Sequence, residues 1–192
     1  DDVDFAGNVA KGVTGMMVNS GQTCSAVSRM LVPKTRMDEA MRVAREAAAT
    51  VTVGDPGGNF AMGPVVSRSQ FDSIQEYIRK GIEEGATLVA GGAGRPQGLT
   101  RGFYVKPTVF ANVTNDMVIA REEIFGPVLS VVRAKNYDAA LQMTNDHEYG
   151  NGTAIFTRDG DAARDFAAKV NVGMVGINVP IPVPLAYYTF GG

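Results

Sequence analysis

The second half of this 192-residue chain alternates short apolar strands with helices. Strands are expected at residues 128–132, 153–157 and 173–178, and helices at 137–144 and 161–169 lie between them. A strand, a crossover helix and a second strand form a βαβ unit, whose strands are parallel. The chain is therefore predicted to be an α/β protein, with a doubly wound, mainly parallel sheet and helices on both faces.

The first half follows the same rules less regularly. Apolar spacing predicts helices at residues 2–18 and 67–84, and a third between Thr35 and the turn at 54–58, where Thr35 and Asp38 resemble a capping box. Strands are expected at 29–32, 87–90 and 104–110. Without an internal repeat or linker, residues 1–192 form one domain. Its functional loops are expected at the carboxyl ends of the parallel strands.

Charge and cysteine usage limit the partners. A formal net charge of −2 gives no sign of nucleic acid or an anionic membrane surface as a partner. No apolar run approaches the roughly 18 residues that span a bilayer. The single cysteine, Cys24, forms no internal disulfide, which fits a reducing compartment and a cytoplasmic location. Cys24 and the single histidine, His147, are too few for a structural zinc site.

Cys24 lies in the polar segment NSGQTCSAVSR, residues 19–29, although structural cysteines usually have apolar surroundings. A nucleophilic thiolate needs exposure and a backbone N–H that can receive a developing oxyanion. A tight turn at residues 21–24 can present both the sulfur and the amide of Cys24. The residues alone leave two readings open, a nucleophile and an inert loop thiol.

Two other segments are weaker candidates for a site. The cluster GGAGRPQG, residues 91–98, lacks the spacing of a dinucleotide-binding fingerprint, and Pro96 interrupts the helix start that a pyrophosphate needs. It is predicted to be a connecting loop. His147 is the one candidate for a histidine base beside Cys24, but the pattern favours a surface histidine at a helix end.

Five segments, in order along the chain, resemble signatures of the aldehyde dehydrogenase superfamily. They are GQTCSAVSR at 21–29, GPVVSRSQFDSIQEYI at 63–78, EEIFGPVLSV at 122–131, YGNGTAIFT at 149–157, and GINVPIPVPLAYYTFGG at 176–192. They are distributed along essentially the whole chain, from residue 21 to residue 192. One such motif would be weak support, whereas five in the family's order are specific.

The resemblance implies a chemistry and a set of site residues. Cys24 is the nucleophile that attacks a small-molecule aldehyde, and NAD or NADP accepts the hydride before a thioester is resolved. Glu123 is expected to hold the nicotinamide ribose, and Phe125 to pack near the nicotinamide. Asn178 and Phe190 match positions near the substrate and the closing loop. No metal is implied.

The resemblance also implies that this chain is the catalytic domain of a longer enzyme. The family's dinucleotide-binding domain and general base precede such a chain, and a C-terminal segment that reaches a neighbouring subunit follows it. The parent enzyme is expected to be a homo-oligomer, and the isolated chain to be inactive. INVPIPVPL resembles the methylmalonate-semialdehyde dehydrogenases, whereas GQTCSAVSR resembles broader-specificity relatives. Asn151 stands where the family usually has leucine.

Two further function classes remain open. One is a cofactor-independent thiol hydrolase or acyl-transfer module that uses Cys24. The other is a non-catalytic fragment that serves only in assembly. The identity of the aldehyde, the choice between NAD and NADP, and the resolution of the thioester by water or coenzyme A also remain open.

Overall fold

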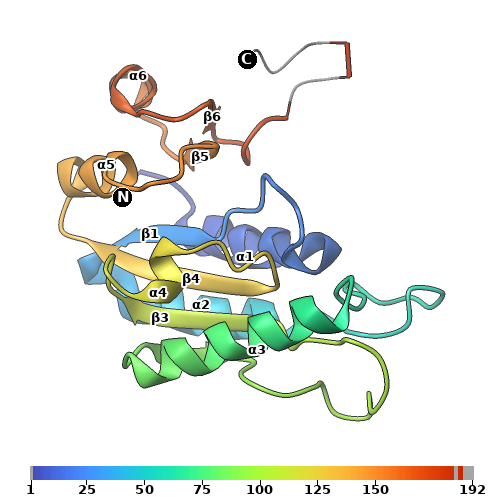
Figure 1. Ribbon diagram of the computed structural model, residues 1–192. Coiled ribbons are helices and arrows are strands. Elements are labelled where there is room, and N and C mark those ends of the chain that lie inside the picture. The colour runs from blue at the N-terminus through green and yellow to red at the C-terminus, as the bar shows by residue number, and fades with distance from the viewer. Residues whose placement is uncertain (1, 184–185, 188–192) are drawn as a thin grey trace.

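The computed structural model describes residues 2–183 and 186–187. The helices are α1 (Phe5–Met16), α2 (Met37–Ala49), α3 (Arg68–Glu83), α4 (Val118–Arg121), α5 (Tyr137–Asn145) and α6 (Gly160–Lys169), with short 3-10 turns η1 (Val18–Gly21) and η2 (Lys34–Arg36). The strands are β1 (Arg29–Pro33), β2 (Thr87–Ala90), β3 (Thr108–Val113), β4 (Val128–Ala134), β5 (Gly152–Ile155) and β6 (Met174–Ile177). The predicted alternation of strands and helices is confirmed (Figure 1).

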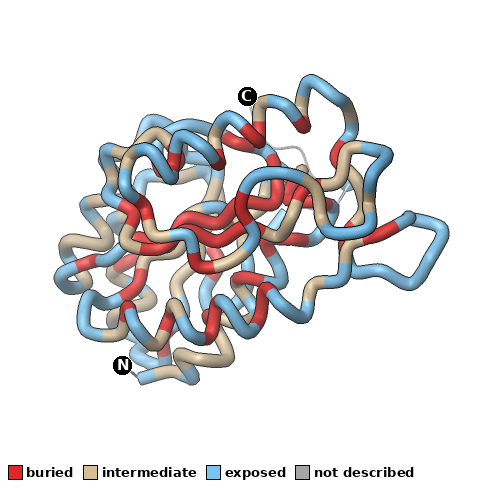
Figure 2. The backbone as a smooth tube through the Cα atoms, turned by 90° about the horizontal axis from the view of Figure 1, so that it is seen from below, coloured by how far each residue is buried: buried red, intermediate tan, exposed pale blue. Residues whose placement is uncertain are grey.

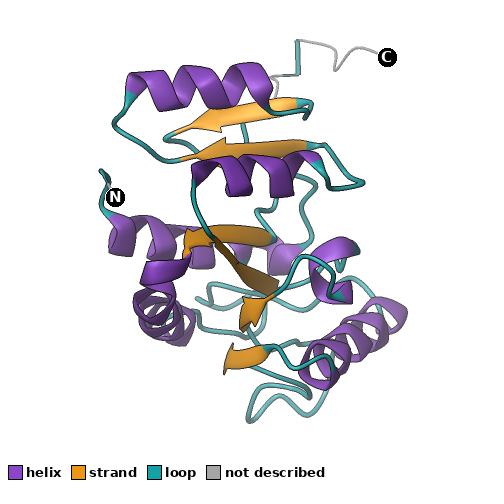
Figure 3. Cartoon of the chain, turned by 90° about the vertical axis from the view of Figure 1, so that its left-hand side faces the viewer, coloured by secondary structure: helices purple, strands orange, loops and turns teal. Residues whose placement is uncertain are grey.

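The main sheet has the strand order β1-β4-β3-β2. β4 pairs in parallel with both β1 and β3, while β2 runs antiparallel at the edge. β5 and β6 form a separate parallel pair, which lies with α5 and α6 as a layer of its own (Figures 1 and 3). The sheet is thus mainly parallel, as predicted, but the six strands within the described residues belong to two sheets.

The central strand β4 explains why helices cover both faces of the main sheet. Its side chains alternate, so that Leu129 and Val131 face one core while Val128 and Val132 face the other. The first core is shared with α1 and α2, and the second with α3 and α4. Figure 3 shows these helices on opposite sides of the strands, and Figure 2 shows the buried residues concentrated between them.

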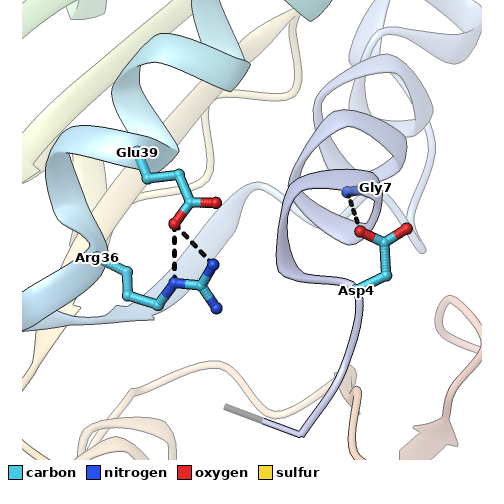
Figure 4. Close-up of polar contacts among 4 residues, drawn as sticks. All are labelled: Asp4, Gly7, Arg36 and Glu39. Carbon is cyan, nitrogen blue, oxygen red and sulfur yellow. Dashed lines mark hydrogen bonds and ion pairs between the residues drawn. The ribbon is translucent and has the colours of Figure 1, made fainter.

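Two local expectations are wrong. The strand predicted at 104–110 is β3 at Thr108–Val113, because residues before Thr108 run as a loop. The predicted capping box also does not form, since α2 begins one residue later, with Arg36 as its N-cap and no side-chain cap. Arg36 instead binds Glu39 at 2.6 Å, and α1 is capped by the Asp4 carboxylate on the Gly7 amide (Figure 4).

No helix within the described residues is both long and apolar enough to cross a bilayer.

Candidate active site

The segment between α1 and β1 presents Cys24 at the tip of a turn. The amide of Ala26 donates to the carbonyl of Thr23 at 2.9 Å, which closes a β-turn with Cys24 and Ser25 at its centre. The Cys24 side chain is exposed and unpaired with another cysteine. The turn that presents Cys24 is therefore 23–26, two residues later than the turn expected from the sequence.

Three consecutive residues before this turn have left-handed backbones. Asn19, Ser20 and Gly21 have φ of 51°, 57° and 69°, a conformation that is costly for residues other than glycine. The Asn19 side-chain amide donates to the Gln22 carbonyl at 2.9 Å, which compensates part of that cost. These left-handed residues directly precede the turn that presents the exposed Cys24.

Hydrogen bonds join the cysteine segment to residues 63–66. The buried Ser20 hydroxyl donates to the Gly63 carbonyl at 2.9 Å. The Gln22 side-chain oxygen accepts from the Val66 amide at 3.0 Å. These two bonds explain why polar residues surround Cys24: they tie the loop to the body of the protein.

A direct backbone contact joins the cysteine segment to residues 122–127, which carry Glu123 and Phe125. A methyl group at Gly21 would lie 2.2 Å from the carbonyl oxygen of Gly126. Glycine is therefore required at Gly21 by its positive φ and by this close approach. The structure brings the predicted nucleophile segment and the predicted cofactor segment together.

Residues 122–125 present their side chains in different ways. Glu122 is engaged, because the Tyr77 hydroxyl donates to its carboxylate at 2.8 Å, and this bond is the main cause that raises the pKa of Tyr77 to about 12. Glu123 is exposed and makes no hydrogen bond or ion pair within the described residues. Phe125 has φ of 51° and remains 38% exposed although it is a large apolar side chain.

Gln70, in the first turn of α3, fixes the shape of this loop. Its side-chain nitrogen donates to the carbonyls of Ile124 and Phe125, at 3.0 and 2.9 Å. These bonds satisfy two carbonyls of a loop whose backbone is left-handed at Phe125. The backbone that carries the exposed Phe125 ring is therefore fixed by hydrogen bonds from Gln70.

The edge of the sheet at which these loops meet differs from the prediction. Cys24 and Glu123 precede β1 and β4, which run parallel, so both lie at the amino ends of their strands. The expectation of one shared end is correct, and the expectation of the carboxyl end is wrong. The loops enter their strands rather than leave them, because α1 and α4 precede the strands on the chain.

A third segment reaches Cys24 from the other sheet. The Asn151 side-chain amide donates to the carbonyl oxygen of Cys24 at 2.6 Å. Asn151 directly precedes β5, so the β5–β6 pair is joined to the cysteine turn.

Asn178 lies at the end of β6, with φ of 59°. Its side chain pairs with the backbone of Thr157, accepting from the Thr157 amide at 2.9 Å and donating to the Thr157 carbonyl at 2.8 Å. None of the described contacts joins Asn178 to Cys24. Phe190, the other predicted substrate-side residue, lies outside the described residues.

His147 has both ring nitrogens committed to backbone groups. Nδ1 accepts from the Tyr149 amide at 3.1 Å, so Nε2 carries the proton and donates to the Ala120 carbonyl at 2.9 Å. The residues around it line a hollow of about 340 Å³ that includes neither Cys24 nor Glu123. His147 is thus a surface histidine beyond the end of α5, and no described contact links it to Cys24.

Comparisons with known proteins identify one family. A family profile described as the aldehyde dehydrogenase family matches residues 1–192.

The chain belongs to the aldehyde dehydrogenase family.

Solved aldehyde dehydrogenases have the same fold. A cysteine-to-alanine mutant of aldehyde dehydrogenase C from Pseudomonas syringae, with NAD+ and octanal, is 44% identical and superposes with a TM-score of 0.92, covering 96% of this chain and 38% of that one. A Sinorhizobium meliloti protein assigned to the methylmalonate-semialdehyde dehydrogenases, with NAD, is 45% identical with a TM-score of 0.92, covering 100% and 40%. An aldehyde dehydrogenase from Mycobacterium tuberculosis, with NAD+, is 40% identical with a TM-score of 0.88, covering 93% and 37%.

This aldehyde dehydrogenase chain spans 38% of the length of curated Staphylococcus aureus relatives that are 44% identical to it over 180 residues. The family resemblance inferred from the motifs is confirmed.

Three bracing residues of the site were not identified from the sequence. Ser20, Gln22 and Gln70 act through backbone groups more than 40 positions away, and a sequence gives no direct signal for such contacts. Gln22 and Gln70 lie inside two of the family motifs, and Ser20 directly precedes the first of these motifs.

Proposed function

We propose that residues 1–192 form the catalytic domain of an NAD(P)-dependent aldehyde dehydrogenase, an oxidoreductase that converts an aldehyde to a carboxylic acid. The observation that carries this proposal is the backbone contact between Gly21 and Gly126. It brings the exposed thiol of Cys24 into the same region as the exposed Glu123 and Phe125. Membership of the family supports the same conclusion.

Cys24 supplies the nucleophile. Its thiolate sulfur adds to the aldehyde carbon, the carbonyl π electrons move to oxygen, and protonation of that oxygen gives a thiohemiacetal. The Cys24 amide donates no hydrogen bond to a described residue and can stabilise the oxyanion. The carbon then gives up a hydride, for which bound NAD(P) would be the acceptor, and the hydroxyl loses its proton, which leaves a thioester. Water hydrolyses the thioester to the acid and the free thiol.

Glu123 and Phe125 fit the nicotinamide end of the cofactor. An exposed carboxylate without a protein partner can accept hydrogen bonds from ribose hydroxyls, and an exposed aromatic ring can pack against a planar nicotinamide. NAD(P), when bound, supplies the hydride acceptor. Several structural neighbours were crystallised with NAD+, which supports NAD or NADP as the cofactor.

The substrate is proposed to be a small-molecule aldehyde, since a related structure contains octanal. Asn178 and Phe190 remain the proposed substrate-side residues. With two hydrogen bonds already made, the Asn178 amide retains one N–H and one lone pair for a further contact. A reactive thiol must stay reduced, so we place the enzyme in the cytoplasm. The full-length enzyme is proposed to be a homo-oligomer, as the family resemblance implies.

The cofactor-independent thiol hydrolase is disfavoured. Such an enzyme pairs its cysteine with a base, and the one histidine of the chain uses both ring nitrogens on the backbone at Ala120 and Tyr149. The role of a non-catalytic assembly fragment leaves the exposure of Cys24 unexplained.

The test is to trap the thioester in the full-length enzyme. Incubation with an aldehyde and NAD, followed by acid quenching and peptide mass spectrometry, is expected to find the acyl group on Cys24. Cys24→Ser is expected to lower turnover about a thousandfold or more, because a serine hydroxyl is poorly ionised. Near-normal turnover in that variant would show that Cys24 is not the nucleophile.

A further inference from the structure

The hydrogen bond between Asn151 and Cys24 joins two parts of the chain that are 127 positions apart. Its donor is a side-chain amide, and its acceptor is the carbonyl of the nucleophile itself. At 2.6 Å it is shorter than most N–H···O bonds. Leucine, the usual residue of the family at this position, has no group that could make it.

The donor is held more firmly than the acceptor. The Gly173 amide donates to the Gly150 carbonyl at 2.7 Å, and Gly152 pairs with Met174 in the β5–β6 ladder. Asn151 lies between these two backbone pairings. Cys24, in contrast, lies at the exposed centre of a turn that a single backbone hydrogen bond closes.

The bond acts on the peptide that follows the nucleophile. A carbonyl that accepts from Asn151 cannot rotate without losing that bond, so the 23–26 turn keeps one orientation. The positive end of the amide dipole also offsets the partial negative charge of the Cys24 carbonyl oxygen. The first effect fixes the direction in which Cys24 projects, and the second reduces the electrostatic field that the carbonyl exerts on its surroundings.

We propose that Asn151 is a positioning residue for Cys24, which orients the cysteine turn through the hydrogen bond to the Cys24 carbonyl. The proposal rests on the function proposed above, in which Cys24 is the nucleophile. It makes the β5–β6 pair part of the active site through a backbone atom, without contact between Asn151 and the substrate.

Alkylation of Cys24 by iodoacetamide tests this without cofactor or turnover. The rate at Cys24 is followed between pH 6 and 10 by peptide mass spectrometry in the parent protein and in two variants. Asn151→Asp keeps the shape and replaces the donor with a negative charge, whereas Asn151→Leu removes the donor without adding charge. Asn171→Asp is the matched control, since it adds the same charge beside Gly150, whose added methyl would lie 3.2 Å from the Asn171 carbonyl.

We expect the rate at pH 7 to fall about threefold in Asn151→Leu and about tenfold in Asn151→Asp, with the pH of half-maximal rate moved upward in the latter. Asn171→Asp is expected to react like the parent. Thermal unfolding midpoints identify folded variants, and if Asn151→Leu is unstable, the isosteric Asn151→Asp decides.

Parent-like alkylation in folded Asn151→Asp would overturn the positioning role. So would an equal slowing in Asn171→Asp, because charge alone would then explain the effect. Neither outcome bears on the nucleophile, whose assignment fails only if Cys24→Ser retains turnover.

Discussion

The α-carbon of Gly21 packs against the peptide of Gly126, so closely that an added methyl group would meet the Gly126 carbonyl oxygen at 2.2 Å and the Pro127 nitrogen at 2.8 Å. Gly126 is confined in turn, because its own added methyl would lie 2.4 Å from Ile74 of α3. The cysteine segment, the 122–127 loop and α3 are therefore in contact through positions that have no room for a side chain.

Gly21→Ala is expected to separate the two loops. Alanine at φ of 69° costs about 1 kcal/mol or more, and the clash with Gly126 adds to that cost. We expect a loss of roughly 1–3 kcal/mol in the free energy of unfolding and a marked loss of turnover, measured by denaturant titration and kinetics. The control is Gly15→Ala, since Gly15 lies in α1 with nothing within 4 Å of an added methyl. Gly15→Ala is expected to stabilise the protein by about 0.5–1 kcal/mol.

Gly21→Ala with parent-like stability and turnover would contradict the close contact between Gly21 and Gly126.

Glu123→Gln is expected to weaken cofactor use without unfolding the enzyme. The carboxylate is exposed, so its loss leaves the core intact, while a charge-assisted bond to a ribose hydroxyl contributes about 1.5–3 kcal/mol. Full-length enzyme should therefore lose about tenfold to a hundredfold in kcat/KM for NAD(P), with an unchanged melting temperature.

Glu122→Gln is the matched control, one position away. Its partner is the Tyr77 hydroxyl, and glutamine retains an oxygen that can accept this bond. We expect near-parent kinetics. Equal losses in the two variants would argue against a specific cofactor role for Glu123.

Asp2 makes the stability of the α6 region dependent on pH. Its carboxylate accepts from the Thr157 hydroxyl at 2.8 Å and from the amides of Arg158 and Asp159, and the bond to Thr157 is the main cause that lowers the pKa of Asp2. Because the pKa is lower in the folded state, this stabilisation is fully present above the usual aspartate pKa. It disappears as the pH falls through the lowered folded value.

Asp2→Asn is therefore expected to reduce protection of residues 157–162 in hydrogen exchange at pH 7 and to match the parent under strongly acidic conditions. Unfolding midpoints from pH 7 down to pH 2 provide a second measurement. Asp72→Asn, on the exposed side of α3, is the control and should match the parent at every pH. A parent–variant difference that persists at low pH would mean that the carboxylate charge is not the cause.

The sequence predicted elements well where the pattern was local. The β2 strand at Thr87–Ala90 and the α5 and α6 helices were located to within one residue, because their apolar spacing and flanking residues suffice. Hydrogen bonding between strands was less accessible: nothing in the spacing indicated that β5 and β6 form a separate pair.

For the candidate site, too, local patterns were predictable from the sequence and tertiary contacts were not. Family motifs indicated Cys24, Glu123 and Phe125 as the proposed site residues, but the side of the sheet, the left-handed residues and the bracing by Gln70 depend on tertiary contacts. The Asn151 position was noticed as a departure from the family, while its contact with Cys24 required coordinates.

The polypeptide of residues 1–192, tested alone, is expected to lack aldehyde oxidation with NAD or NADP. In Rossmann-type sites, a glycine-rich fingerprint loop and a helix N-terminus bind the pyrophosphate, and the glycine cluster at 91–98 lacks that spacing. Glu123 and Phe125 are proposed to contact only the nicotinamide end, so we expect dinucleotide affinity of about millimolar or weaker, roughly −4 kcal/mol. Calorimetry with NAD and a spectrophotometric assay of NADH formation measure the two expectations, while alkylation of the exposed Cys24 confirms that the thiol is accessible. Micromolar binding or measurable NADH formation by residues 1–192 would mean that this chain holds a complete cofactor site at residues other than those proposed.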